Sequence, residues 1–171
     1  MGARPKVATQ GWQLNSGLYF HSGPSYTVLA SSNTSGNGEY ADRADTTGTS
    51  PYAGVTHKIV NGVVQWFNPA AFADPPVGQY GTTRRGQYTS PGFSDVDFSV
   101  IKNLKIWDTA HLQLRAEMFN LFNRINLAPV GAPGVGDSSG TITSTIGVFY
   151  ATPGIGQGEP FSTQFAARIT F

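Results

Sequence analysis

Four segments of the chain alternate between apolar and polar residues with a period of two, the period of a β-strand with one apolar face. Their apolar members are Trp12, Leu14, Leu18 and Phe20; Val96, Phe98, Val100, Leu104 and Ile106; Leu112, Leu114, Ala116 and Met118; and Phe161, Phe165, Ala167, Ile169 and Phe171. Ser16 and Lys102 interrupt this pattern. The alternation predicts an all-β chain with antiparallel strands at about 12–30, 93–107, 111–122 and 161–171.

The second and third segments are predicted to form a hairpin, because only residues 108–110 separate them. Residues opposite one another in a hairpin lie on the same face, and both apolar sets are even-numbered, so paired positions must sum to an even number. A three-residue loop meets this condition, whereas a two-residue loop would set apolar against polar residues. The expected pairs are Ile106 with Leu112, Leu104 with Leu114, and Val100 with Met118.

The stretches between the predicted strands, 31–92 and 123–160, are long and rich in Gly, Pro and Ser. Within the first, Asn61-Gly62 lies between short apolar runs and predicts a small hairpin with a type I′ turn. Within the second, Thr141–Tyr150 is a candidate for a short strand. Strands of about ten residues joined by short turns at one end and long loops at the other are typical of outer-membrane barrels.

Composition supports this interpretation and narrows the function. Only 12% of the residues are charged, about half the usual share, and the chain has 21 glycines and 11 prolines. The net charge of +1 gives no reason to expect a nucleic-acid partner. The absence of cysteine excludes disulfides, thiolate metal sites and cysteine nucleophiles. The first residues lack the apolar stretch of a signal peptide, so we expect either a chain that crosses no membrane or a piece of a longer protein.

No residue pattern predicts catalysis, a metal or a cofactor, and we expect no enzymatic activity. Residues 136–140 resemble the segment around a serine-protease nucleophile, and His57 is available, but a Gly/Ser turn is the simpler interpretation. His21, His57 and His111 lack the spacing of zinc ligands.

Two loop segments carry weaker indications of binding. Asp42, Asp45 and Glu39 lie close enough in sequence to suggest calcium, although their spacing does not fit an EF-hand and a solvated loop is favoured. Arg84 and Arg85, with Tyr80 and Tyr88, have the chemistry to bind an anion or a glycan, which two arginines do not establish alone.

Seven segments resemble the C-terminal part of TonB-dependent outer-membrane receptors, most closely the Oar-like, carboxypeptidase-regulatory-domain type found in acidobacteria. They are residues 11–18, 22–28, 66–72, 90–93, 95–100, 112–123 and 164–171, in the order found in that family. The stretch 115–123, Arg-Ala-Glu-Met-Phe-Asn-Leu-Phe-Asn, is the most specific of them. The resemblance implies a single fragment, 1–171, that forms the last four strands of a barrel of about 22 strands closed around a plug.

The resemblance also implies a role for the C-terminus. Phe165, Ile169 and Phe171 are similar to the signal by which the outer-membrane assembly machinery recognises a last strand, with Ile169 in one of the expected aromatic positions. With the last strand ending at the periplasmic rim, the 108–110 turn is periplasmic and both long loops are extracellular. Trp12, Trp107 and Phe171 then lie at one rim, and Trp66 is a further candidate for an interface girdle.

Charged residues fall on the polar faces of the predicted strands: Asp95, Asp97, Arg115, Glu117 and Arg168. In a barrel they would line the lumen, where they either guide a solute and hold a plug or, as we favour, compensate one another.

Four strands cannot close a barrel, and unpaired strand edges are costly in lipid, so both edges are expected to need partners. The first hypothesis is a non-catalytic wall and loop segment of a TonB-dependent transporter in the bacterial outer membrane, in contact with lipid, with the remaining barrel and with its plug. The alternative is a self-assembling β-rich fragment that forms extracellular filaments or tubes by pairing with copies of itself. A third possibility, ranked last, is a small eight-stranded barrel.

Overall fold

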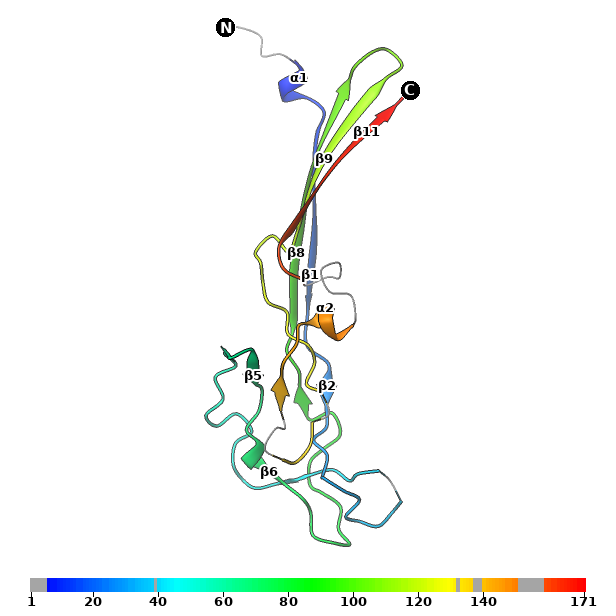
Figure 1. The fold of residues 1–171 in the computed structure, drawn as a ribbon. Helices are drawn as coiled ribbons and strands as arrows, with labels where there is room; N and C mark the ends of the chain where they lie inside the picture. Colours follow the sequence, from blue (N-terminus) through cyan, green and yellow to red (C-terminus); the bar gives the residue numbers. More distant parts are fainter. Residues whose placement is uncertain (1–5, 39, 132, 137–139, 151–158) are drawn as a thin grey trace.

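A computed structural model describes residues 6–38, 40–131, 133–136, 140–150 and 159–171. Its main element is a four-stranded antiparallel sheet of β1 (Trp12–His21), β8 (Phe93–Lys105), β9 (His111–Phe119) and β11 (Ser162–Thr170), in the order β1-β8-β9-β11. The molecule is elongated: the β8–β9 turn, the C-terminus and the short helix α1 (Lys6–Thr9) lie at one end, and the long loops lie at the other (Figure 1).

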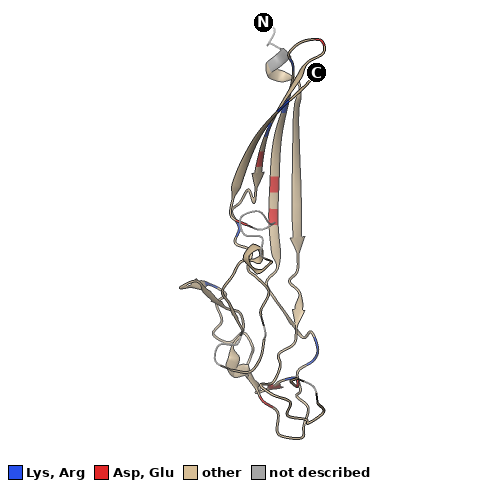
Figure 2. Cartoon of the chain, turned by 45° about the vertical axis from the view of Figure 1, so that its right-hand side comes forward, with Lys and Arg blue, Asp and Glu red and all other residues tan. Residues whose placement is uncertain are grey.

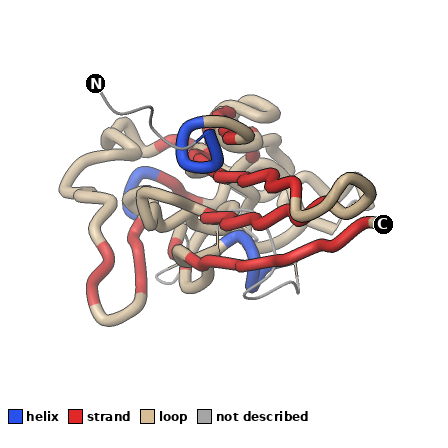
Figure 3. The backbone as a smooth tube through the Cα atoms, turned by 90° about the horizontal axis from the view of Figure 1, so that it is seen from above, coloured by secondary structure: helices blue, strands red, loops and turns tan. Residues whose placement is uncertain are grey.

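The all-β prediction and the order of the four strands are confirmed. Seen from above, the strands form one open layer and no closed ring, so the eight-stranded barrel is wrong for the described residues (Figure 3). No helix among the described residues is both long enough and apolar enough to span a membrane.

The first strand is shorter than the predicted 12–30 because the chain turns after His21. Pro24 offers no N–H for a ladder, and the backbone at Gly23 lies directly against the carbonyl groups of Ser90 and Pro91. An added Cβ at Gly23 would be 2.1 Å from the Ser90 oxygen, so only glycine fits there. Strand β9 is likewise shorter than the predicted 111–122. It ends at Phe119, before two residues of positive φ, Asn120 (46°) and Asn123 (47°).

The β8–β9 hairpin has the predicted parity but a register two residues away from the predicted one. Leu104 pairs with Leu112 and Val100 with Ala116, so Val100 does not oppose Met118. The Ile106 N–H donates to the Ala110 carbonyl at 3.0 Å, which makes the three-residue loop 107–109 and not 108–110. An ion pair between Lys105 and Asp108 at 2.7 Å closes this turn. Both registers set apolar against apolar residues, so the period-two pattern does not distinguish between them.

The remaining strands are short and lie outside the large sheet. β2 (Ser25–Tyr26) pairs with β7 (Tyr88–Thr89), and β3 (Asp45–Thr46) pairs with β6 (Phe72–Ala73). β4 (Ile59–Val60), β5 (Val63–Gln65) and β10 (Thr141–Ile142) form a third small sheet, and a 3₁₀ turn spans Pro69–Ala71.

The predicted Asn61-Gly62 hairpin is confirmed, with φ values of 50° and 79° that suit a type I′ turn. The predicted strand at Thr141–Tyr150 is mostly wrong. Its first two residues form β10, and Ile146–Phe149 form a helical turn, α2.

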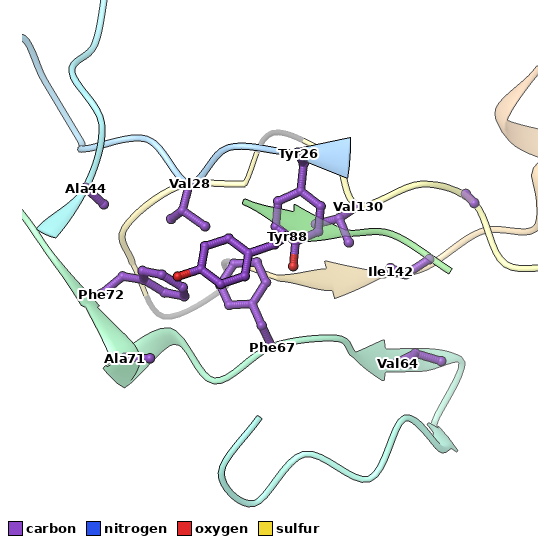
Figure 4. Close-up of a cluster of buried hydrophobic side chains, with 11 residues drawn as sticks. Tyr26, Val28, Ala44, Val64, Phe67, Ala71, Phe72, Tyr88, Val130 and Ile142 are labelled. Atoms are coloured by element: carbon purple, nitrogen blue, oxygen red, sulfur yellow. The ribbon is translucent and has the colours of Figure 1, made fainter. Parts of the chain in front are cut away.

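The hydrophobic core lies among these loop segments and not in the large sheet. We call the described residues of 22–92 and 120–150 the loop lobe. Its core consists of Tyr26, Val28, Ala44, Val64, Phe67, Ala71, Phe72, Tyr88, Ala128, Val130 and Ile142 (Figure 4). Phe67 is fully buried, and Phe72 meets both Phe67 and Tyr88 edge to face, with ring centroids 5.3 Å apart in each pair. The two long loops therefore fold together as one packed body.

Candidate functional sites: a two-faced sheet and a cleft in the loop lobe

The large sheet has two chemically distinct faces. Register places the odd residues of β1, β8 and β9 on one face with the even residues of β11, and this face is mainly polar. The opposite face is apolar, and Lys102 is its one charged residue within the four strands. Charged residues are sparse along the whole sheet (Figure 2). A sheet with one polar and one apolar face is what the wall of a membrane barrel requires.

The five residues of the predicted polar ladder all belong to the polar face: Asp95, Asp97, Arg115, Glu117 and Arg168. Arg115 and Glu117 form an ion pair with each other, at 3.5 Å and partly exposed. The Asp97 carboxylate instead accepts a hydrogen bond from the Asn120 N–H at 3.1 Å, and Asp95 is buried beside the loop lobe. The ladder therefore includes one ion pair, and its Asp97 is bonded to the backbone where β9 ends.

The apolar face is open to its surroundings. Leu14 on β1 is 64% exposed and Phe165 on β11 is 79% exposed, although both lie on regular strands. Such a continuous exposed apolar surface is costly in water and favourable against lipid chains. Near the turn end of the sheet, Lys102 Nζ lies 4.5 Å from the centre of the Trp12 ring and donates to the Gln10 carbonyl. Both contacts direct its charge toward the end of the sheet and away from its middle.

The residues of the predicted assembly signal share this apolar face. Phe165 is opposite Ala116 and Ile169 is opposite Leu112, while Phe171 follows the last strand residue and is 92% exposed. They are arranged as an accessible row on an outer strand. Their recognition by assembly machinery remains a prediction.

Two asparagines join the sheet to the loop lobe. Asn120 is buried, and its side-chain amide donates to the carbonyls of Arg124 and Glu159 at 2.8 and 2.7 Å. Asn126 is also buried and accepts from the Ser94 N–H at 2.9 Å. These contacts fix the positions at which the chain enters β8 and leaves β9. Asn120 also belongs to the segment 115–123 that carries the family resemblance.

A cleft of about 510 Å³ opens on the surface of the loop lobe. Its polar lining comprises Thr27, Asn37, Asp42, Arg43, Tyr80 and Arg85. The sequence pointed to Tyr80 and Arg85, and the structure brings these two together. It places Tyr88 in the core, and Arg84 is not part of the lining. Arg43 was missed because it lies far from Arg85 in sequence and within no recognisable motif.

Ionisation in the loop lobe follows local hydrogen bonding and burial. The Asp42 carboxylate accepts from the Ser35 N–H at 2.6 Å, from the Ser35 hydroxyl at 3.0 Å and from the Thr34 hydroxyl at 3.2 Å. The Ser35 N–H is the largest cause of a pKa for Asp42 below its usual 3.8. Burial in the core raises the pKa of the Tyr26 and Tyr88 phenols.

The remaining candidates do not converge on a site. The Asp45 carboxylate accepts from the Thr82 N–H, whereas the Asp42 carboxylate accepts from Thr34 and Ser35. Glu39 and residues 137–139 lie outside the described residues. Among the described residues, no group of three His, Asp or Glu side chains is placed to hold a metal ion. Trp66 does not belong to a girdle at the sheet: it stacks on His57 within the loop lobe, with centroids 4.2 Å apart, and its indole N–H donates to the Thr89 carbonyl.

A comparison with protein families identifies one relationship. A family model described as "Outer membrane beta barrel domain" matches residues 4–149, which include β1, β8, β9 and nearly all of the loop lobe. No curated protein and no solved structure matches the chain.

Proposed function

The chain belongs to the outer membrane beta barrel domain family, and from this premise we propose that it is the C-terminal wall segment of a TonB-dependent receptor in the bacterial outer membrane. In this proposal β1, β8, β9 and β11 form part of the barrel wall, and the loop lobe covers the extracellular mouth. The chain performs no catalysis. It contributes to energy-coupled uptake of a solute together with the rest of the barrel, its plug and the surrounding lipid.

One observation carries the proposal: the large sheet has an exposed apolar face and a polar face, with neither face covered by other described elements over most of its length. β1, β9 and β11 have 10, 9 and 9 residues, close to the ~9–11 that a tilted strand needs to cross a bilayer. The asymmetry of one tight turn, 107–109, and two long loops also supports it. The family resemblance of 115–123 supports the finer assignment to TonB-dependent receptors.

Cysteine accessibility tests the placement in the membrane, because the natural chain has no cysteine. Adjacent substitutions on β1 form a matched pair: in outer membranes, a membrane-impermeant maleimide should label Asn15→Cys on the polar face and leave Leu14→Cys on the apolar face unlabelled. On intact cells, Tyr52→Cys in the loop lobe should react, whereas Thr109→Cys in the tight turn should react only after the outer membrane is permeabilised. Equal labelling of Asn15→Cys and Leu14→Cys would contradict a wall segment.

The transport part of the proposal needs its own test. Uptake of the receptor's solute should stop when TonB is deleted or the proton-motive force is collapsed, with the amount of receptor in the membrane unchanged. Uptake that persists under both conditions would exclude a TonB-dependent mechanism and leave a passive barrel.

A second candidate function is self-assembly into extracellular filaments or tubes. It is favoured by the two outer strands, β1 and β11, which each have one neighbour in the part of the chain that the structure describes. A net charge of +1 offers little repulsion between copies. Electron microscopy of the purified chain without detergent tests it: ordered filaments are expected if the edges pair with sister copies, and small monodisperse particles would eliminate this candidate.

A further inference from the structure

We propose that the cleft in the loop lobe binds a small organic anion, whose acidic groups pair with Arg43 and Arg85 and whose ring packs against Tyr80. This inference goes beyond the proposed function, and it rests on that function only for the side of the membrane to which the cleft opens. A volume of about 510 Å³ lies within the range of ~300–1,000 Å³ that is typical of small-molecule sites.

The charge of the cleft favours an anion. Arg43 and Arg85 both line it and are exposed, and neither forms an ion pair with a carboxylate among the described residues. The one acidic residue in the lining, Asp42, has its carboxylate engaged by the backbone and side chains of its own loop. Two arginines therefore line one concavity, and among the described residues neither is paired with a carboxylate. Planar guanidinium groups match carboxylate, sulfate and phosphate geometry with paired hydrogen bonds.

The backbone that carries the two arginines is well fixed. Arg43 forms an isolated β-bridge with Leu29, which also lines the cleft, and its neighbours are held by the backbone hydrogen bonds Ala30 N–H to Asp42 and Ala44 N–H to Val28. The residue after Arg85 donates its N–H to the Thr27 hydroxyl at 2.8 Å. Because both walls are held without a ligand, binding needs little ordering of the chain, which lowers its entropic cost.

Tyr80 supplies a flat aromatic surface in the lining of the cleft. Tyr80 is 63% exposed and lies beside Arg43, because the backbone of Gly81 packs against the Arg43 carbonyl. An added Cβ at Gly81 would be 1.8 Å from that oxygen, so the close approach depends on glycine. An exposed tyrosine in the same cleft lining as two arginines offers an apolar plane for a ring and a hydroxyl for its polar edge.

Calorimetric titration of the full chain, purified in detergent, tests the proposal with digalacturonate as the probe and its uncharged dimethyl ester as the matched control ligand. Digalacturonate should bind, and the dimethyl ester should bind at least about tenfold more weakly, the size expected for losing charge-assisted hydrogen bonds. Inorganic phosphate, which has the charge without the ring, should also bind more weakly than digalacturonate. Equal binding of digalacturonate and its ester, or no binding of digalacturonate at millimolar concentration, would overturn the proposal.

Substitutions locate the site. Arg43→Gln and Arg85→Gln should each weaken digalacturonate binding about tenfold or more, whereas Arg84→Gln removes the same charge from the adjacent position outside the cleft and should leave binding unchanged. Arg85→Lys should lose part of the affinity, and Tyr80→Ala should affect digalacturonate but not phosphate. An equal loss in Arg84→Gln and Arg85→Gln would show a diffuse charge effect and overturn the site.

The two proposals fail separately. Binding in detergent does not depend on placement in the membrane. A cysteine-labelling pattern other than the expected one would therefore contradict the wall assignment without affecting the proposed binding site. Protease resistance of each variant, compared with the natural chain, verifies that the loop lobe is folded in every titration.

Discussion

The large sheet and the loop lobe bury apolar side chains in opposite ways. The loop lobe has its own core, in which Phe67 and Val28 are fully buried although most of its strands have two residues. The sheet has long regular strands, yet Leu14 and Phe165 on its apolar face remain exposed. Regular secondary structure and a packed core are therefore found in different parts of this chain. The apolar face of the sheet is not buried by the described residues, whereas the loop lobe buries its own core.

This difference teaches where each region obtains its stability. Exposed apolar area on the sheet contributes nothing until something apolar covers it, whereas the loop lobe gains at once from removing its side chains from water. Substitutions in the two regions should therefore respond to different conditions: those in the lobe to water and pH, and those in the sheet to the presence of a bilayer.

The largest effect is expected for Phe67→Ala. Removing this fully buried ring should cost the loop lobe about 3–5 kcal/mol, because the transfer energy of the ring and the cavity left behind add together. Proteolysis of the lobe and its thermal unfolding measure the loss. Phe122→Ala, at an exposed aromatic position, is the control and should change stability by less than about 0.5 kcal/mol. If Phe67→Ala also prevents insertion of the strands into membranes, the two regions are not separate.

The next largest loss of stability is expected for Val100→Arg. Val100 lies mid-strand on the apolar face, where an arginine in contact with lipid costs about 2–4 kcal/mol at the midplane of the bilayer. Its neighbour Ser99 lies on the polar face opposite Glu117, so Ser99→Arg should be tolerated. Urea titration of each variant folded into lipid vesicles gives the comparison. Equal costs at the two positions would contradict the assignment of the faces.

A smaller loss of stability of the loop lobe is expected at acidic pH. The pKa of Asp42 is lower in the folded loop lobe than its usual 3.8, so the stabilisation is complete above pH 3.8 and is lost as the pH falls through the lower folded value. Protease protection of the lobe should decline in that window. Asp42→Asn should remove this pH dependence and leave the sheet unaffected. An unchanged acid transition in the variant would assign it to another group.

The smallest effect is expected for the ion pair on the polar face. Arg115 and Glu117 are 3.5 Å apart and remain partly exposed, so Arg115→Gln should change the free energy of unfolding by less than about 1 kcal/mol. Added salt should reduce even that difference, because it screens exposed charges. A larger loss in the urea titration, insensitive to salt, would mean that the polar face is drier than the wall of a water-filled lumen.

Period-two alternation predicted the four long strands because each strand has one apolar face. The same signal could not select the register of the β8–β9 hairpin, since shifting the pairs by two residues keeps apolar opposite apolar. The Lys105–Asp108 contact that closes the turn is not periodic. Strand ends were also missed, because Gly23 and Asn120 act through close contacts with distant segments.

The packed core of the loop lobe was not predicted from the sequence. Its core residues, such as Tyr26, Phe67 and Ile142, come from distant segments with strands of two or three residues, too short for a periodic signal. The cleft was only partly predicted for the same reason. Tyr80 and Arg85 are five residues apart in sequence, while Arg43 comes from a distant segment that packs against Gly81. Only the Asn61-Gly62 turn carries a local signature strong enough to be recognised alone.

The pairing of β1 with β8 also affects the order in which the parts of the chain fold. β8 and β9 meet across a three-residue loop, but β1 must pair with β8 across residues 22–92, whose described residues belong to the loop lobe. Contacts between distant segments form slowly because the entropy of closing the intervening chain is lost first. If the lobe compacts early, it brings His21 and Phe93 together and shortens that search. The loop lobe, which contributes no strand to the large sheet, would then determine how fast that sheet forms.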